Sequence, residues 1–175
     1  VLVRLQAPDA PAELPQRTPL HLALVIDRSG SMAGQPLAEA KRCAEFVLDG
    51  LQPTDRLALV TYDGTAETLV PAAPLHDKEP IRRAIRGVCE GGCTNLHGGW
   101  LQGGETLAPH TGDGVTSRII LLSDGCANEG LTDHDQIIQL ERSAMKWPGI
   151  PENFSFMVMK NLKDNRPSFY RLRRN

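Results

Sequence analysis

The feature that most constrains the fold is a set of three short, continuously apolar runs that end abruptly at polar residues. These runs span Leu20–Ile26, Arg56–Tyr62 and Arg118–Leu122, and the first is followed directly by Asp27. Runs of this length without polar alternation are typical of strands buried on both faces. We therefore expect a parallel sheet at the centre of the fold.

Helical patterns separate these runs. The first has Pro36 in its opening turn and Gly50 near its end. Asp77 is expected to cap a second helix, and a third is expected from Thr132 to about Lys146. The apolar positions of the first two are Leu37, Ala40, Ala44, Val47 and Leu51, then Ile81, Ala84, Ile85 and Val88.

Strands that alternate with helices indicate an α/β domain. The short segment Ala66–Val70 lies between Gly64 and Pro71, which favours an antiparallel edge strand. The predicted fold is a Rossmann-like, doubly wound, mostly parallel sheet with one antiparallel edge strand and helices on both faces.

Composition excludes several classes of protein. The 175 residues are 41% hydrophobic and 23% charged, which is ordinary for one globular domain and unlike disordered or collagenous chains. No stretch approaches the roughly 18 apolar residues of a membrane span. The net charge of −2 gives the chain as a whole no attraction for nucleic acid.

We expect three parts in the chain. Residues 1–19 are interpreted as an upstream strand and a Pro-rich linker, and 20–159 as the domain, with Phe154–Met159 as its last strand. Residues 160–175 are interpreted as a basic tail, with six basic residues against one acidic residue. Since the chain begins at Val1 without a signal-peptide pattern, it is expected to belong to a larger multidomain chain.

Oxygen-bearing side chains follow the predicted strands. Asp27, Ser29 and Ser31 come after the first strand, Asp124 follows the Arg118–Leu122 strand, and Thr94 precedes a helix-like stretch. In open α/β sheets, ligands bind outside the carboxyl ends of the strands, so these side chains are expected to converge. Taken singly, each is also an ordinary turn residue, and Thr94 an ordinary helix cap.

Two carboxylates and three hydroxyls form a set of hard oxygen ligands without thiolate or imidazole. Such ligands suit Mg²⁺, Mn²⁺ or Ca²⁺ rather than zinc or copper. Two carboxylates neutralise a divalent ion, which leaves coordination positions for water or for an incoming acidic group. The sequence thus predicts a metal site formed by Asp27, Ser29, Ser31, Thr94 and Asp124.

The Asp27-Arg28-Ser29-Gly30-Ser31 segment, Thr94 and Ser123-Asp124-Gly125 together resemble the metal-ion-dependent adhesion site of von Willebrand factor type A domains. The sequences around these residues are similar to those of bacterial members of the family and of inter-alpha-trypsin inhibitor heavy chains. The resemblance covers roughly Leu20 to Glu141.

The resemblance implies a role for each residue of the set. Ser29 and Ser31 would bind the metal directly, and Asp27 and Asp124 directly or through water. Thr94 would be a switchable ligand, and the open position would take a Glu or Asp carboxylate from a protein partner. The implied function is a non-enzymatic, metal-dependent binding module without a catalytic residue.

Two other functions remain open. A Mg²⁺-dependent phosphatase or phosphotransferase also places an Asp after the first strand, but usually needs a second Asp where this chain has Ser29. GxxxxGK[ST], GxSxG and HExxH are absent, which disfavours P-loop enzymes, serine hydrolases and zinc hydrolases. The third possibility is a structural domain that has lost metal binding.

The four cysteines do not match a common zinc spacing. Cys43 is expected on the apolar side of the first helix as a small core residue. Free thiols are expected throughout, with a bridge between Cys93 and Cys126 as the alternative.

Overall fold

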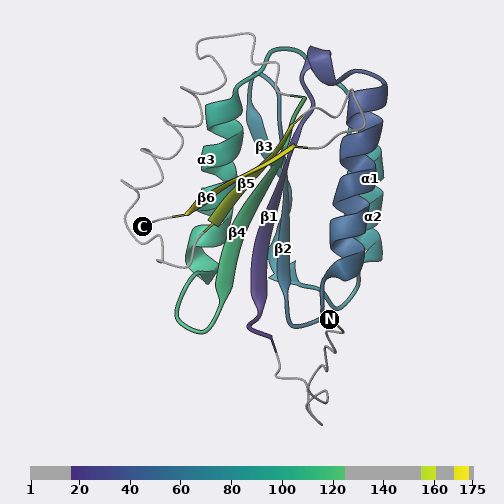
Figure 1. Ribbon diagram of the computed structural model, residues 1–175. Helices are drawn as coiled ribbons and strands as arrows, with labels where there is room; N and C mark the ends of the chain where they lie inside the picture. The colour runs from purple at the N-terminus through teal and green to yellow at the C-terminus, as the bar shows by residue number, and fades with distance from the viewer. Residues whose placement is uncertain (1–16, 125–154, 161–167, 174–175) are drawn as a thin grey trace, which may run out of the picture.

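The computed structural model describes residues 17–124 and two further strands at 155–160 and 168–173. They form one six-stranded sheet with the order β3-β2-β1-β4-β5-β6 (Figure 1). The strands are β1 Leu20–Asp27, β2 Arg56–Tyr62, β3 Ala66–Pro74, β4 Thr116–Leu122, β5 Ser155–Lys160 and β6 Ser168–Arg173. All three of the predicted apolar runs are confirmed as strands, and so is the strand predicted at Phe154–Met159.

The four central strands are parallel, and an antiparallel strand lies at each edge. β1 pairs in parallel with both β2 and β4, and β4 pairs in parallel with β5. β3 is the antiparallel edge strand that the sequence predicts, and it pairs with β2. β6 adds a second antiparallel edge beside β5. The carboxyl ends of β1, β2 and β4 therefore meet along one edge of the sheet.

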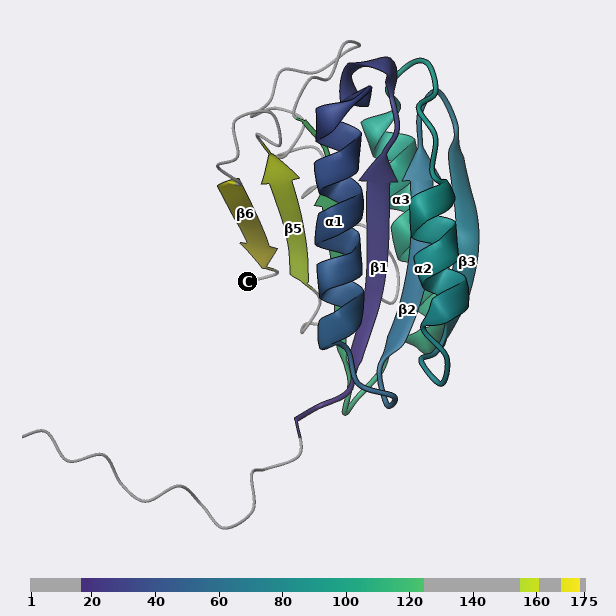
Figure 2. The same cartoon turned by 90° about the vertical axis from the view of Figure 1, so that its right-hand side faces the viewer.

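Helices cover both faces of the sheet. The two helices α1 (Gln35–Gly50) and α2 (Glu79–Gly87) lie on one face, and α3 (Leu96–Leu107) lies on the other (Figure 2). The 3-10 turns η1 (Gly30–Met32) and η2 (Ala108–His110) complete the described elements. The Rossmann-like, doubly wound α/β fold is thus confirmed.

The alternation of side chains along the central strands divides the core into two layers. Leu22, Leu24 and Ile26 of β1 pack toward α1 and α2, whereas Ala23 and Val25 pack toward α3. Both sets are at most 1% exposed, as expected for a strand buried on both faces. This explains why the sequence of β1 shows no polar alternation.

Glycines let α3 approach the sheet closely. A Cβ added at Gly99 would lie 2.3 Å from the ring of Tyr62, and one added at Gly103 would lie 2.7 Å from a methyl group of Val25. Trp100, between them in sequence, is 1% exposed and belongs to the same core layer. Gly99 and Gly103 are therefore required for this packing, although glycine weakens a helix by about 1 kcal/mol relative to alanine.

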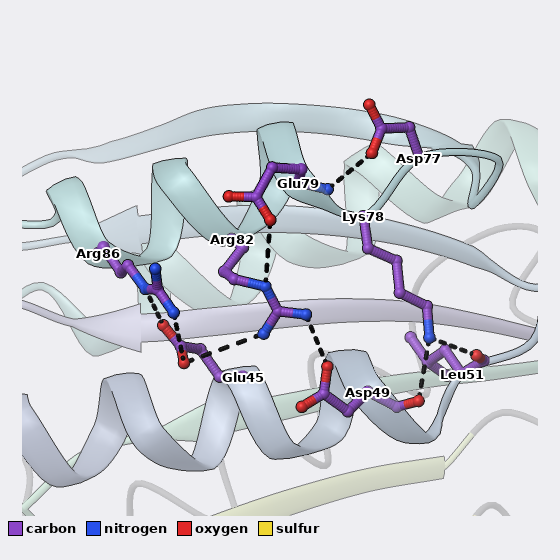
Figure 3. A network of polar contacts seen from close by, with 8 residues as sticks. All are labelled: Glu45, Asp49, Leu51, Asp77, Lys78, Glu79, Arg82 and Arg86. Carbon is purple, nitrogen blue, oxygen red and sulfur yellow. Dashed lines mark hydrogen bonds and ion pairs between the residues drawn. The ribbon is translucent and has the colours of Figure 1, made fainter.

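A polar network joins the exposed sides of α1 and α2 (Figure 3). The Arg82 guanidinium lies 2.7 Å from the Asp49 carboxylate, and Arg86 donates to Glu45 over 2.7 Å. Lys78 donates to the main-chain carbonyls of Asp49 and Leu51. Because solvent and salt screen exposed pairs, this network orients the two helices more than it stabilises them.

At the end of the sheet opposite the candidate site, the buried Asp55 carboxylate joins the start of β1 to the loop after α1. It accepts hydrogen bonds from the backbone N–H groups of Leu20 (2.9 Å) and Gln52 (2.6 Å) and forms an ion pair with Arg17. Burial opposes its ionisation, but the hydrogen bonds from Arg17, Leu20 and Gln52 outweigh burial. The pKa of Asp55 is therefore held below its usual value.

Several sequence predictions concern residues outside 17–124. Within the interpreted basic tail, Ser168–Arg173 forms β6, which the sequence analysis did not predict. An edge strand tolerates charged residues, so charge alone is a poor guide to a tail. Residues 1–16, the predicted 132–146 helix and Cys126 lie outside the described residues.

The three described cysteines and the first two helices can be compared with the sequence analysis. Cys43, Cys89 and Cys93 are free, and Cys43 packs half-buried against the core. The N-cap of α2 is Lys78 rather than the predicted Asp77, which lies one residue earlier and accepts from the Glu79 backbone N–H. Of the helices that the structure describes, none has the length and apolarity needed to cross a membrane.

We predict that Asp55→Asn lowers the free energy of unfolding at pH 7 by about 1.5–3 kcal/mol, the range for hydrogen bonds to charged groups. The folded-state pKa of Asp55 is depressed, so its stabilisation is present above the unfolded value of about 3.9 and is lost as the pH falls through the folded value. Urea denaturation at pH 7, 5 and 3 should show the difference from wild type shrinking only at the lowest pH.

The matched control is Asp77→Asn, since Asp77 is an exposed aspartate that accepts one backbone hydrogen bond. It should change stability little at any of these pH values. An Asp55→Asn difference that stays constant down to pH 3 would contradict an ionised, stabilising carboxylate.

Candidate metal centre

The candidate site lies where the carboxyl ends of β1, β2 and β4 meet, at the top of the sheet in Figure 1. Asp27 is the last residue of β1 and is 0% exposed. Asp124 follows β4 by two residues and is 6% exposed, and Thr94 stands two residues before α3 and is 9% exposed. Acidic and hydroxyl side chains from distant parts of the sequence are therefore buried at one edge.

The Asp27 carboxylate is held by three hydrogen bonds. Its Oδ1 accepts from the Ser29 backbone N–H over 2.9 Å. Its Oδ2 accepts from the Tyr62 hydroxyl over 3.0 Å and from the Ser123 hydroxyl over 2.8 Å. The sequence analysis missed Tyr62, whose place as the last residue of the strand beside Asp27 was the available signal.

Tyr62 is fully buried at this edge. Burial, and next the neighbouring Asp27 carboxylate, raises the pKa of Tyr62 well above its usual value. The phenol therefore stays protonated and acts as a hydrogen-bond donor to Asp27.

A chain of hydrogen bonds links the other predicted ligands. The hydroxyl oxygens of Ser29 and Ser31 lie 3.3 Å apart, and the Ser31 hydroxyl donates to Asp124 Oδ1 over 3.3 Å. The turn η1 creates this arrangement, because Met32 donates its N–H to the Ser29 carbonyl and buries its side chain completely. The structure thus brings Ser29, Ser31 and Asp124 together.

Thr94 lies on a loop that is bonded to the Asp27 loop through the main chain. Gly91 donates its N–H to the Arg28 carbonyl over 2.6 Å, and Gly30 donates to the Gly92 carbonyl over 2.8 Å. Asn95, not Thr94, caps α3, since its Oδ1 accepts from the Gly98 N–H. The alternative role of Thr94 as the helix cap is therefore taken by Asn95, and the prediction of Thr94 as a metal ligand stays a prediction.

An ion pair flanks the candidate ligands. The Arg28 guanidinium lies 2.9 Å from Asp63 Oδ2. Asp63 also accepts from the Thr65 N–H over 3.0 Å. This bond, followed by the charge of Arg28, holds the pKa of Asp63 below its usual value. A Cβ at Gly91 would lie 2.3 Å from Asp63 Oδ2, so a larger residue there would displace the Asp63 side chain from this position.

The residues present fit a hard divalent cation. Asp27 is a buried carboxylate that, within residues 17–124, is not in an ion pair with any Lys, Arg or His, because Arg28 pairs with Asp63. Its neighbours supply hydroxyl and carboxylate oxygens, the ligands that Mg²⁺, Mn²⁺ and Ca²⁺ prefer. The described part of the chain contains no cluster of three His, Cys, Asp or Glu residues, so any site here depends on the serine hydroxyls.

The fold agrees with the comparisons to known proteins. A profile of the von Willebrand factor type A domain matches residues 22–127. The chain belongs to the von Willebrand factor type A domain family, whose members commonly mediate protein–protein adhesion.

Individual relatives support the same assignment. The chain is 35% identical over 125 residues to an uncharacterized protein of Synechocystis sp., covering 71% of this chain and 29% of that protein. It is 31% identical over 177 residues to human inter-alpha-trypsin inhibitor heavy chain H3, covering 93% of this chain and 20% of the heavy chain. The chain thus spans less than a third of these curated relatives.

A solved structure is similar as well. Three N-terminal domains of the type V pili tip protein Mfa5 from Porphyromonas gingivalis match with a TM-score of 0.56 and 28% identity. This match covers 63% of the present chain and 20% of that one.

We predict that Asp63→Ala loosens the loop that carries Thr94, because it removes the partner of Arg28. A loss of about 1 kcal/mol would speed hydrogen exchange of the Gly91 amide about fivefold. Amide exchange followed by NMR measures this directly.

Asp77→Ala is the matched control, since Asp77 makes a similar local bond to the Glu79 N–H at the start of α2. It should leave exchange at Gly91 unchanged. Equal exchange rates at Gly91 in wild type and Asp63→Ala would show that the ion pair does not hold this loop.

Proposed function

We propose that this domain is a metal-dependent protein-binding module that captures an acidic residue of a partner protein. A divalent cation, Mg²⁺ or alternatively Mn²⁺ or Ca²⁺, would be held by Asp27, Ser29, Ser31, Thr94 and Asp124. The observation that carries the proposal is the buried Asp27 carboxylate, without a cationic side chain as partner in residues 17–124, beside the bonded Ser29, Ser31 and Asp124.

The chain's own groups orient this set. Asp27 is fixed by its three donors, and the short turn η1 directs the hydroxyls of Ser29 and Ser31 toward each other. When bound, a divalent cation supplies a Lewis-acidic position for a carboxylate oxygen. The two carboxylates of the site balance the charge of the ion. The partner's carboxylate would therefore be attracted by an open coordination position on the ion rather than by a large net charge.

Arg28 is a second group that could contact an acidic partner. Its guanidinium borders the candidate ligands and is 28% exposed while it pairs with Asp63. The pair with Asp63 leaves no net positive charge there, so an anionic side chain would gain the guanidinium only by replacing Asp63 as its partner.

The test is a titration of Mn²⁺ into the protein, followed by paramagnetic resonance, with Asp27→Ala and Asp124→Ala as variants. We expect saturable binding by wild type and its loss in both variants, because each removes one of the two carboxylates. Asp77→Ala, an aspartate at the start of α2, should bind like wild type. Wild-type protein that is folded and does not bind Mn²⁺ would support the alternative of a structural domain.

A second step tests capture of a carboxylate. A Glu-containing peptide should tighten Mn²⁺ binding, and the metal should tighten peptide binding by the same factor, as linkage requires. The matched Gln-containing peptide should do neither. Metal-dependent turnover of a generic phosphate ester that disappears in Asp27→Ala would instead favour the phosphatase alternative.

A further inference from the structure

Tyr62 is an aromatic residue at the candidate site that does not belong to the sequence motif. The pairing of β1 with β2 places it opposite Asp27. Its hydroxyl donates to Asp27 Oδ2, and the Ser123 hydroxyl donates to the same oxygen. A carboxylate oxygen accepts about two hydrogen bonds, so Oδ2 is fully used by the protein. Acceptor capacity therefore remains only on Oδ1, beside the Ser29 N–H.

The tyrosine ring is itself held in place. It is 0% exposed and packs directly against Gly99 of α3. A Cβ at residue 99 would lie only 2.3 Å from the Cδ1 of the ring. The Tyr62 carbonyl also accepts from the Arg28 N–H over 2.9 Å. The phenol is thus a rigid donor that the sheet and α3 position before any ligand arrives.

We propose that Tyr62 is a positioning residue for the metal site: its hydroxyl fixes the Asp27 carboxylate so that only Oδ1 faces the ion. This inference rests on the proposed function. A group that orients a metal-binding carboxylate commonly changes metal affinity by 10–100-fold when it is removed.

The orientation has a consequence for metal selectivity. Mg²⁺ demands near-ideal octahedral geometry, whereas Ca²⁺ accepts irregular arrangements with more oxygens. Without the Tyr62 hydroxyl, Asp27 keeps its bonds from Ser29 and Ser123 but regains acceptor capacity on Oδ2, so that both oxygens can be offered to an ion. Loss of the hydroxyl therefore penalises Mg²⁺ more than Ca²⁺.

The experiment compares wild type with Tyr62→Phe by Mn²⁺ titration and by competition of Mg²⁺ and Ca²⁺ against bound Mn²⁺. We expect Tyr62→Phe to bind Mn²⁺ and Mg²⁺ about tenfold more weakly and to shift selectivity toward Ca²⁺. A merely structural role would not change the ratio of Mg²⁺ to Ca²⁺ affinity.

Thr61→Val is the matched control. Thr61 precedes Tyr62 on β2, is 1% exposed, and its hydroxyl has no hydrogen-bond partner in the described part of the chain. The substitution removes a buried hydroxyl of the same strand and should leave both affinities unchanged. Urea denaturation should find each variant folded.

Ser123→Ala removes the second donor to Oδ2 and provides an independent variant. A loss of affinity in Ser123→Ala without any loss in Tyr62→Phe would overturn the role of Tyr62 while leaving the metal site intact. Failure of folded wild type to bind Mn²⁺ would overturn the proposed function, and with it this inference.

Discussion

The structure depends on the parallel pairing of β1 with two neighbours at once. The register places Asp27 opposite Tyr62 of β2 and Ile26 opposite Leu122 of β4. A slip of one residue would turn every side chain of β1 to the other face and separate Asp27 from its donors. The two faces of β1 differ in side-chain size, since the large side chains face α1 and α2 while Ala23 and Val25 face the glycines of α3. Packing therefore favours this register, and with it the position of the carboxylate.

Main-chain hydrogen bonds transmit this placement to the loops. Arg28 donates to the Tyr62 carbonyl, and the loop before α3 is bonded to Arg28 and Gly30 through Gly91 and Gly92. Because backbone groups make these bonds, the placement of the two loops should tolerate most side-chain substitutions. The exceptions are positions where a larger side chain would meet a neighbouring residue. Gly91 is such a place, since it lies against Asp63.

The central strands and the positions of the candidate ligands after them could be predicted from the sequence, since local patterns determine both. The continuous apolar runs predicted the central strands, and the oxygen-bearing residues after them indicated the candidate ligands. The set of metal ligands itself stays a prediction. The roles of Tyr62 and Asn95 could not be predicted in this way, because they depend on which side chains meet across β1, β2 and α3.

Charge was the weakest guide. Arg28 pairs with Asp63, a contact between loops that a linear pattern does not reveal. Ser168–Arg173 was interpreted as part of a basic tail but pairs with β5. In both cases tertiary pairing decides what a charged residue does.

The glycines of α3 also bear on how the candidate site becomes ordered. Four of the twelve residues of Leu96–Leu107 are glycine, at about 1 kcal/mol each relative to alanine, and an isolated helix of this length is already marginal. α3 is therefore expected to be stable only once Tyr62 and Val25 provide a surface to pack against. Ordering of the segment that carries Thr94, directly before α3, is therefore coupled to the packing of that helix on the sheet.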